Sequence, residues 1–184
     1  MGKTIAILGV DGTGKSSVIQ EIQKRLGKKC CIKYMGYRSF DDPRIEKINN
    51  SAHGFVSGIK LKYLIYKEYL RRYKGAKEEN KLVIFDRYVH EIYINSNGIG
   101  GIINKVLYKY LYPKPDLIVY LHCPAEVSLS RKDDIPNEQV FRAMKSRFDV
   151  TFMNNKHCLC LSSEDYTSPQ LADKIIEYIN KNII

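Results

Sequence analysis

The sequence has no long hydrophobic run. The first apolar stretch, Ile5–Val10, is too short for the core of a secretory signal or for a membrane span. Nothing later in the chain reaches the roughly 18 uninterrupted apolar residues that a transmembrane helix requires. The start also lacks the serine or threonine at position six that a myristoylation signal contains. We therefore expect a cytoplasmic protein that does not use a membrane.

Cysteine is scarce and shows no ligand spacing. There is no C-x-x-C motif, and no histidine lies at zinc-finger distance from the five cysteines, Cys30, Cys31, Cys123, Cys158 and Cys160. They lie in or beside apolar stretches, where a reduced cysteine behaves as a small hydrophobic residue. We interpret them as packing residues rather than metal or redox sites. A satisfied or solvated side chain is expected at each of the scattered histidines, His53, His90, His122 and His157.

No internal repeat, low-complexity tract or linker divides the 184 residues, a length that one domain usually accounts for. The sequence thus predicts a single domain, 1–184. Acidic residues are the minority among the charges: 20 Asp and Glu stand against 30 Lys and Arg, which gives a net charge of +10. This charge predicts an anionic partner, but it does not choose among nucleotide, nucleic acid and membrane surface.

Short apolar runs alternate with longer helical patterns. The runs are almost continuously apolar, as expected for strands covered on both faces: Thr4–Gly9, Cys30–Met35, Leu82–Phe85, Leu117–Leu121 and Cys158–Leu161. The segments between them that fit crossover helices are Lys15–Leu26, Ile59–Lys74, Asn137–Thr151 and Ser168–Asn180. This alternation predicts an α/β fold with a mostly parallel sheet and helices on both sides.

The predicted helix Ile59–Lys74 carries two neighbouring stripes. An apolar stripe repeats at steps of three and four: Ile59, Tyr63, Tyr66, Leu70 and Tyr73. A basic stripe lies beside it: Lys60, Lys67, Arg71 and Lys74. We interpret most of these residues as a core face and a solvated face. The alternative is that part of the basic stripe borders an anion site.

Residues 9–16, GVDGTGKS, match the phosphate-binding loop pattern G-x-x-x-x-G-K-[ST]. The loop follows an apolar strand and opens an amphipathic helix, as its mechanism requires. Its glycines let backbone N–H groups turn around phosphate oxygens, beside a helix N-terminus that already favours anions. Lys15 would then reach the β- and γ-phosphates, and the hydroxyl of Ser16 would bind Mg²⁺. The alternative is a glycine-rich turn without a ligand.

Two further groups of charged residues fit the same chemistry. Asp86 ends an apolar run, where a phosphate loop needs a carboxylate for the water shell of Mg²⁺, and Arg87 adds a planar fork suited to phosphate. Arg131 and Lys132 stand in SRKDDIP, 130–136, where paired cations on a mobile loop can neutralise charge on transferring phosphates. The alternative for this second group is a solvated turn.

Taken together, GVDGTGKS at 9–16, DRY at 86–88, PDLIVYL at 115–121, Pro124 and Arg131 resemble thymidylate kinase and its relatives, in the family's order and across nearly the whole chain. The resemblance implies a P-loop NTPase-type three-layer α/β/α kinase domain with a five-stranded parallel sheet and a short LID around 131–137. It also implies ATP and Mg²⁺ as cofactors and a nucleoside monophosphate as substrate. Members of the family are commonly dimers, so a homodimer is a further expectation.

The resemblance also assigns residues to roles. ATP would be held by Gly9, Asp11, Gly12, Thr13, Gly14, Lys15, Ser16, Ser17, Arg131 and Lys132. The acceptor would contact Asp11, Arg38, Arg87 and Tyr88, and the metal would lie near Ser16 and Asp86. The catalytic groups would be Lys15, Asp86, Arg87 and Arg131. Because Gly12 and Thr13 stand where one class of these enzymes has a basic residue, the catalytic cation is expected from the LID.

The sequence departs from the family where the acceptor base is read. No arginine of the segment 63–72 aligns with the family's base-reading arginine, and the tract 89–95 lacks the usual small residues. We therefore expect phosphoryl transfer with dTMP as the first acceptor to test, and a same-fold kinase for another nucleotide, nucleoside or small acceptor as the alternative. A basic nucleic-acid-binding ATPase or a non-catalytic nucleotide-binding module is the alternative of another class. Nucleic acid is not expected as a partner, since no DNA- or RNA-binding signature is present.

Overall fold

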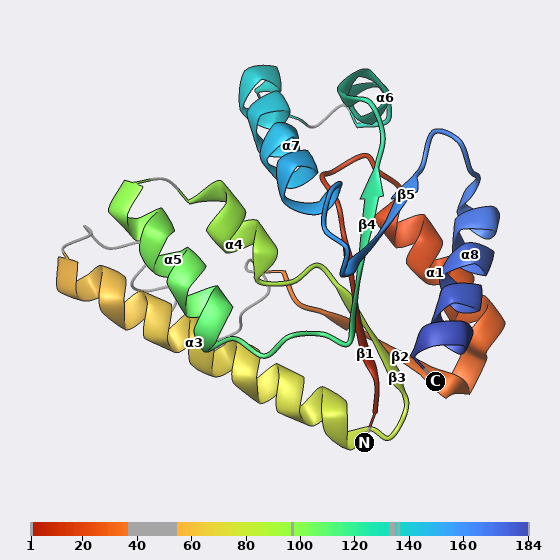
Figure 1. Ribbon diagram of the computed structural model, residues 1–184, viewed down its shortest axis with the longest axis horizontal. Helices are drawn as coiled ribbons and strands as arrows, with labels where there is room; N and C mark the ends of the chain where they lie inside the picture. Colours follow the sequence, from red (N-terminus) through yellow and green to blue (C-terminus); the bar gives the residue numbers. More distant parts are fainter. Residues whose placement is uncertain (1, 37–54, 97, 133–134, 136, 184) are drawn as a thin grey trace.

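The computed structural model describes residues 2–36, 55–96, 98–132, 135 and 137–183 (Figure 1). Within these residues five parallel strands form one sheet: β1 (Thr4–Leu8), β2 (Cys30–Tyr34), β3 (Leu82–Asp86), β4 (Leu117–His122) and β5 (Cys158–Ser162). Their spatial order is β2-β3-β1-β4-β5, so that the first strand is the central one. All pairs are parallel, with Ile7 of β1 opposite Asp86 on one side and Val119 on the other. The predicted five-stranded parallel sheet is confirmed, each strand within one residue at either end.

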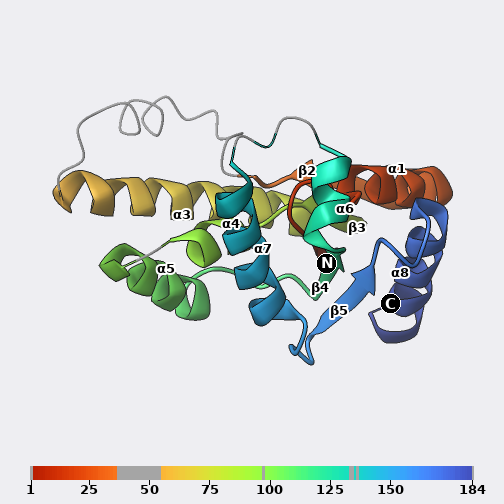
Figure 2. The same cartoon turned by 90° about the horizontal axis from the view of Figure 1, so that it is seen from above.

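Helices cover both faces of this sheet (Figures 1 and 2). The helical segments in the described part of the chain are α1 (Lys15–Leu26), the 3₁₀ turn η1 (Gly27–Lys29), α3 (Phe55–Glu78), α4 (His90–Asn95), α5 (Gly98–Tyr110), α6 (Ala125–Ser130), α7 (Glu138–Phe152) and α8 (Ser168–Asn182). Helices α1 and α8 pack together on one face, and α3, α4 and α7 lie on the other. The predicted three-layer α/β/α arrangement is therefore confirmed.

Local sequence sets where several helices begin. The Asn137 side chain accepts a hydrogen bond from the Val140 N–H at the start of α7, as an N-cap residue does. Thr167 and Gln170 form a reciprocal capping box at the start of α8. In contrast, α1 begins after Gly14 with no side-chain cap among the described residues and no acidic residue in its first turn. Its first backbone N–H groups are left for another acceptor.

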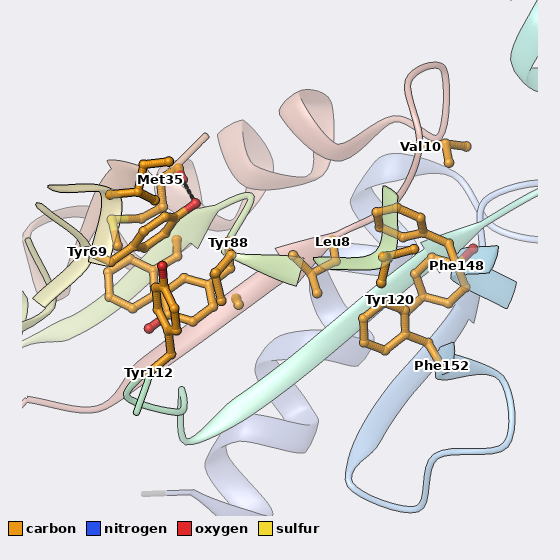
Figure 3. Packing of buried hydrophobic residues seen from close by; sticks show 14 of the residues in the cluster. Leu8, Val10, Met35, Tyr69, Tyr88, Tyr112, Tyr120, Phe148 and Phe152 are labelled. Atoms are coloured by element: carbon orange, nitrogen blue, oxygen red, sulfur yellow. Dashed lines mark hydrogen bonds between the residues drawn. The ribbon is translucent and has the colours of Figure 1, made fainter. Parts of the chain in front are cut away.

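The two faces of the sheet have different cores. Between the sheet and helices α1 and α8 the fully buried residues are aliphatic or cysteine, for example Val18, Ile22 and Ile175. The opposite core is rich in aromatic rings, which Figure 3 shows: Tyr69, Tyr88, Tyr112, Tyr120, Phe148 and Phe152. There the Tyr69 hydroxyl donates to the carbonyl of Met35 at 2.8 Å, which satisfies a buried polar group.

The apolar stripe predicted on helix α3 faces the core only in part. Ile59 and Tyr63, at its N-terminal end, are 52% and 57% exposed, whereas Tyr66 and Tyr73 pack against the aromatic core. The described residues that α3 buries most completely lie beside this stripe: Leu64, Ile65, Tyr69 and Ala76. Apolar side chains occur on two adjoining faces of this helix, so periodicity alone could not choose between them. The basic stripe is exposed, as the interpretation of a solvated face predicted.

Three other expectations concern histidine, cysteine and membrane spans. His90 is 1% exposed, and its Nδ1 has no hydrogen-bond partner within the described residues, so it is neither solvated nor fully satisfied as predicted. His53 lies outside the described residues. The cysteines of the described chain are all free thiols, either buried or partly buried. No described helix combines the length and apolar character that crossing a bilayer would require.

Candidate active site

The phosphate-binding loop joins β1 to α1 and is held open by left-handed glycines. Gly12 and Gly14 have φ of +84° and +79°, a region that residues with a Cβ rarely adopt. At Gly12 space is also limiting, because a Cβ would stand 2.4 Å from the carbonyl oxygen of Ser128. The loop thus presses against α6, and the uncapped N-terminus of α1 points backbone N–H groups at the space that a phosphate would fill.

The Lys15 side chain folds back along this loop. Its Nζ donates to the carbonyls of Gly9 and Val10, both at 2.8 Å, and lies 3.8 Å from a carboxylate oxygen of Asp11. Thr13 braces the same turn by donating to Val10 O at 2.8 Å. Burial, with repulsion from Arg87 as the next cause, lowers the pKa of Lys15 to about 8. An anion bound at the loop would stabilise the charged form of Lys15, whereas burial alone destabilises it.

Ser16, Ser17 and Asp86 lie where a metal ion would meet the loop. The two serines are exposed in the first turn of α1, while Asp86 is half-buried at the end of β3, the strand beside β1. Burial raises the pKa of Asp86 against the opposing charges of Lys15 and Arg87. Burial makes it costly to ionise this carboxylate, and a nearby cation would offset that free-energy cost.

This donor set fits Mg²⁺. In the described residues no group of three or more His, Cys, Asp or Glu side chains gathers to form an all-protein metal site. Mg²⁺ does not need one, since it is usually bound through one or two protein oxygens together with water and substrate phosphates. Ser16 and Asp86 would supply those oxygens.

Arg87 is placed by a strained turn directly after β3. Its φ of +67° is left-handed, and its backbone N–H donates to Ile7 O at 3.2 Å, which ties the turn to β1. The guanidinium bridges two carboxylates, Asp11 at 2.5 Å and Glu91 at 2.6 Å. Burial works to lower the pKa of Arg87, but the two carboxylates outweigh it and raise that pKa. The arginine is therefore charged and aimed from β3 towards the phosphate loop.

Arg131 reaches the loop from the far side. Its Nη1 donates to Gly12 O and to Ser163 Oγ, both at 3.4 Å, and its Nη2 donates to Ser163 O at 3.2 Å. Lys132 is exposed beside it. The pKa of Asp11 is lowered: burial works to raise it, but the attraction of Arg87, then of Lys15 and Lys132, outweighs burial.

A cavity of about 890 Å³ opens from the loop and is bounded by helices α3, α4, α5 and α7. At the loop end it is lined by Gly9, Val10, Asp11, Arg87 and Glu91. Its walls are mainly apolar: Leu61, Ile65, Ile92, Tyr112, Ile135, Val140, Phe141, Met144 and Phe148. Polar residues return at the α3 to α5 end: Lys62, Ser96 and Asn104. A cavity with two polar ends and apolar walls suits an elongated anion with a planar, largely apolar body.

Most predicted site residues lie in or around the phosphate loop, and three of them, Gly9, Asp11 and Arg87, also line the cavity. Two predicted residues are exceptions. Tyr88 is fully buried in the aromatic core, and its hydroxyl donates to Pro113 O at 2.6 Å. Its side chain therefore holds β3 to the segment before β4, and the prediction that it contacts the acceptor is corrected. Arg38 lies outside the described residues.

Sequence reasoning missed other residues of the site. Glu91 lies in α4, four residues after Arg87, and pairs with it across the left-handed turn that precedes this helix; a helical spacing rule does not predict that pair, because Arg87 is not in the helix. Lys62, Ser96 and Asn104 had no sequence signal either, because only the fold brings α3 and α5 together. Of the basic residues on α3, it is Lys62 that lines the cavity, and Lys62 belongs to neither predicted stripe.

Comparison with known proteins agrees with this geometry. The family model described as thymidylate kinase matches residues 7–168. A probable thymidylate kinase 1 of Saccharolobus solfataricus is 25% identical over 189 residues, with both chains covered in full.

Two solved structures share the fold. One is thymidylate kinase from Candida albicans, with a TM-score of 0.75 and 17% identity, covering 98% of this chain and 92% of that one. The other is deoxyadenosine kinase from M. mycoides with products dCMP and dCDP, with a TM-score of 0.66 and 19% identity, covering 97% and 99%.

Proposed function

The chain belongs to the thymidylate kinase family of nucleoside monophosphate kinases, and we propose that it transfers the γ-phosphoryl group of MgATP to dTMP. The products would be dTDP and ADP. The observation that carries the proposal is the continuity between loop and cavity: the phosphate loop that ends β1 forms one end of the cavity, and Arg87 lines that same end. Donor and acceptor phosphates would meet there.

The chain's own charges would do the positioning. Lys15 and the N-terminal N–H groups of α1 would hold the donor phosphates, and Arg87 would hold the acceptor phosphate. Arg131, already beside Gly12, would neutralise charge on the transferring group as part of a short LID. Mg²⁺, held by Ser16 and Asp86 with the phosphates, would neutralise charge on the donor oxygens.

A phosphorylated acceptor fits the cavity better than a nucleoside. Arg87 is kept charged and lines the loop end of the cavity, where a phosphate on the acceptor would give its guanidinium an anionic ligand. Similarity to a deoxyadenosine kinase structure keeps a nucleoside acceptor as the second candidate.

Release of ADP across a panel of acceptors tests the proposal. The panel holds dTMP, dUMP, dCMP, dAMP, dGMP and thymidine, and a Lys15→Met variant purified in the same way controls for contaminating kinases. We expect dTMP to give the highest kcat/KM. Faster turnover with thymidine would favour a nucleoside kinase, and no ADP release with any acceptor would overturn the proposal. Turnover that requires DNA would favour the nucleic-acid-dependent ATPase.

The oligomeric state stays a prediction. Helix α5 presents a stripe of exposed apolar side chains at helical spacing: Ile99, Ile102, Val106 and Tyr110. Sedimentation velocity would show whether the chain is the expected homodimer.

A further inference from the structure

We propose that Glu91 is a positioning residue for phosphoryl transfer, which holds the guanidinium of Arg87 across the loop end of the cavity so that the acceptor phosphate is bound in line with the donor. Glu91 acts through Arg87 rather than by binding the acceptor phosphate, which its own charge repels. This inference rests on the proposed function, because it needs a phosphate on the acceptor and a donor at the loop.

The backbone places Arg87 but does not fix its guanidinium. The residue stands in the left-handed turn between β3 and α4, and its backbone N–H donates to Ile7 O at 3.2 Å. Its side chain is long and has several rotatable bonds, so that holding it in one conformation costs entropy. The direction of the guanidinium must therefore come from the groups that contact its tip.

Two carboxylates from different elements hold that tip. Nη2 of Arg87 donates to Asp11 Oδ1 of the phosphate loop at 2.5 Å, and Nη1 donates to Glu91 Oε1 of α4 at 2.6 Å. The guanidinium thus spans from the loop to α4, at the end of the cavity that all three residues line. Among the described residues these carboxylates engage one N–H of each terminal nitrogen, and the other N–H groups remain for a phosphate.

Glu91 is the more permanent of the two partners. Its side chain is 20% exposed, against 45% for Asp11, and its helix packs against α5 and α7. Asp11 also lies 3.8 Å from Lys15 Nζ, so it is shared between two cations. Burial works to lower the pKa of Arg87, and Glu91 is the largest of the influences that raise this pKa, ahead of Asp11. Arg87 is therefore anchored chiefly by Glu91.

A displaced guanidinium would affect the chemical step more than the binding of the acceptor. Removing Glu91 leaves the charge of Arg87 in the cavity and takes away a negative charge that repels phosphate, so acceptor affinity should not fall. The attacking phosphate oxygen would, however, lose its alignment with the γ-phosphoryl group, and a misplacement of about 1 Å can lower a rate about 100-fold. We therefore expect the loss in kcat and not in the KM for the acceptor.

Steady-state kinetics with dTMP and saturating MgATP test the inference on three substitutions of Glu91. Glu91→Gln keeps the length and an oxygen that accepts from Nη1, Glu91→Asp keeps the charge but is one methylene shorter, and Glu91→Leu keeps neither. We expect kcat to fall about 10- to 100-fold in Glu91→Leu and Glu91→Asp, and to stay within about fivefold of the wild type in Glu91→Gln. The KM for dTMP should change less than about threefold in all of them.

The matched control is Glu21→Leu. Glu21 pairs with Arg25 at the same spacing of four residues, on α1, which lies on the opposite face of the sheet. Breaking this pair should change neither kcat nor the KM for dTMP.

A double-variant cycle shows whether Glu91 acts through Arg87. In an Arg87→Gly background, Glu91→Leu should lower kcat less than about twofold, because the group that Glu91 positions is gone. A full loss of kcat in that background would overturn the positioning role.

The other outcomes separate the possible failures. A wild-type kcat in Glu91→Leu would overturn the role, and so would a Glu91→Asp variant faster than Glu91→Gln, since charge rather than orientation would then matter. A KM for dTMP that rises about tenfold with kcat unchanged would count against it as well. If Glu91→Leu does not fold, the comparison of Glu91→Gln with Glu91→Asp decides, with melting temperatures as the check on structure. A wild-type protein that phosphorylates no nucleoside monophosphate would overturn the proposed function itself.

Discussion

Acid should destabilise the fold through His90, and the size of the effect follows from its surroundings. The imidazole is packed among the rings of Tyr88, Tyr93, Tyr108 and Phe152. Its Nε2 shares a hydrogen bond with the Tyr108 hydroxyl at 2.5 Å. Burial lowers its pKa to about 3, so the native state keeps it neutral where the unfolded chain would protonate it.

The sign and magnitude follow from this difference. The unfolded histidine has a pKa near 6.5, so below that pH the unfolded state binds a proton that the native state refuses. The contribution to stability is full above about pH 6.5 and declines as the pH falls towards 3. Each pH unit in that window costs about 1.4 kcal/mol, which amounts to about 2 kcal/mol between pH 7 and pH 5.

Urea unfolding of the wild type and of a His90→Phe, Tyr108→Phe double variant at pH 7, 6 and 5 measures the effect. The second substitution removes the hydroxyl that would otherwise lose its partner. The double variant should lose about 2 kcal/mol less than the wild type between pH 7 and 5, whatever its stability at pH 7. His157→Asn, which removes an exposed histidine, is the matched control. Parallel pH profiles for wild type and double variant would refute the reasoning.

Four other predictions concern the site. Lys15→Met should lower turnover at least about 100-fold with little change in melting temperature. In the wild type, kcat/KM for ATP should fall above about pH 8 as Lys15 loses its proton. A kcat/KM profile that stays flat to about pH 9.5 would contradict this assignment. Arg87→Gly should raise the acceptor KM at least about tenfold, and it should be more stable than Arg87→Ala because glycine accepts a φ of +67°. Gly12→Ala should weaken ATP binding in calorimetry and lower the melting temperature, whereas Gly75→Ala, which has open space around it, should do neither. Arg131→Ala should reduce kcat more than ATP affinity, and equal losses would argue against a transition-state role.

The sheet could be predicted from the sequence because both of its faces are covered. In a domain of this size, nearly continuous apolar runs such as Leu82–Asp86 are most readily buried as strands with helices on both faces. Helix α5 was not predicted, because Gly98, Gly100 and Gly101 lie in its first turn and glycine lowers helix propensity. It is stabilised instead by packing on α4, including the stacked rings of Tyr93 and Tyr108.

The parts of the site whose residues lie close together in the sequence could be predicted. The phosphate loop and Asp86 follow from short motifs whose spacing is set by one strand and one turn. The end of the cavity that Lys62, Ser96 and Asn104 line depends instead on how α3 is rotated and where α5 lies, and no local sequence pattern specifies either. Tyr88 illustrates the same limit, since its neighbour Arg87 faces the cavity while Tyr88 itself faces the core.

The central position of β1 places the phosphate loop between two groups of elements. On the β4 side the loop contacts α6 and the residue after it, through Ser128 and Arg131. The cavity is lined by residues of α3, α4, α5 and α7 together with Gly9, Val10 and Asp11 of the loop itself. An acceptor bound there would contact the loop directly. We therefore expect substitutions in α3 or α7 that shift a bound acceptor to change the rate of phosphoryl transfer as well as acceptor affinity.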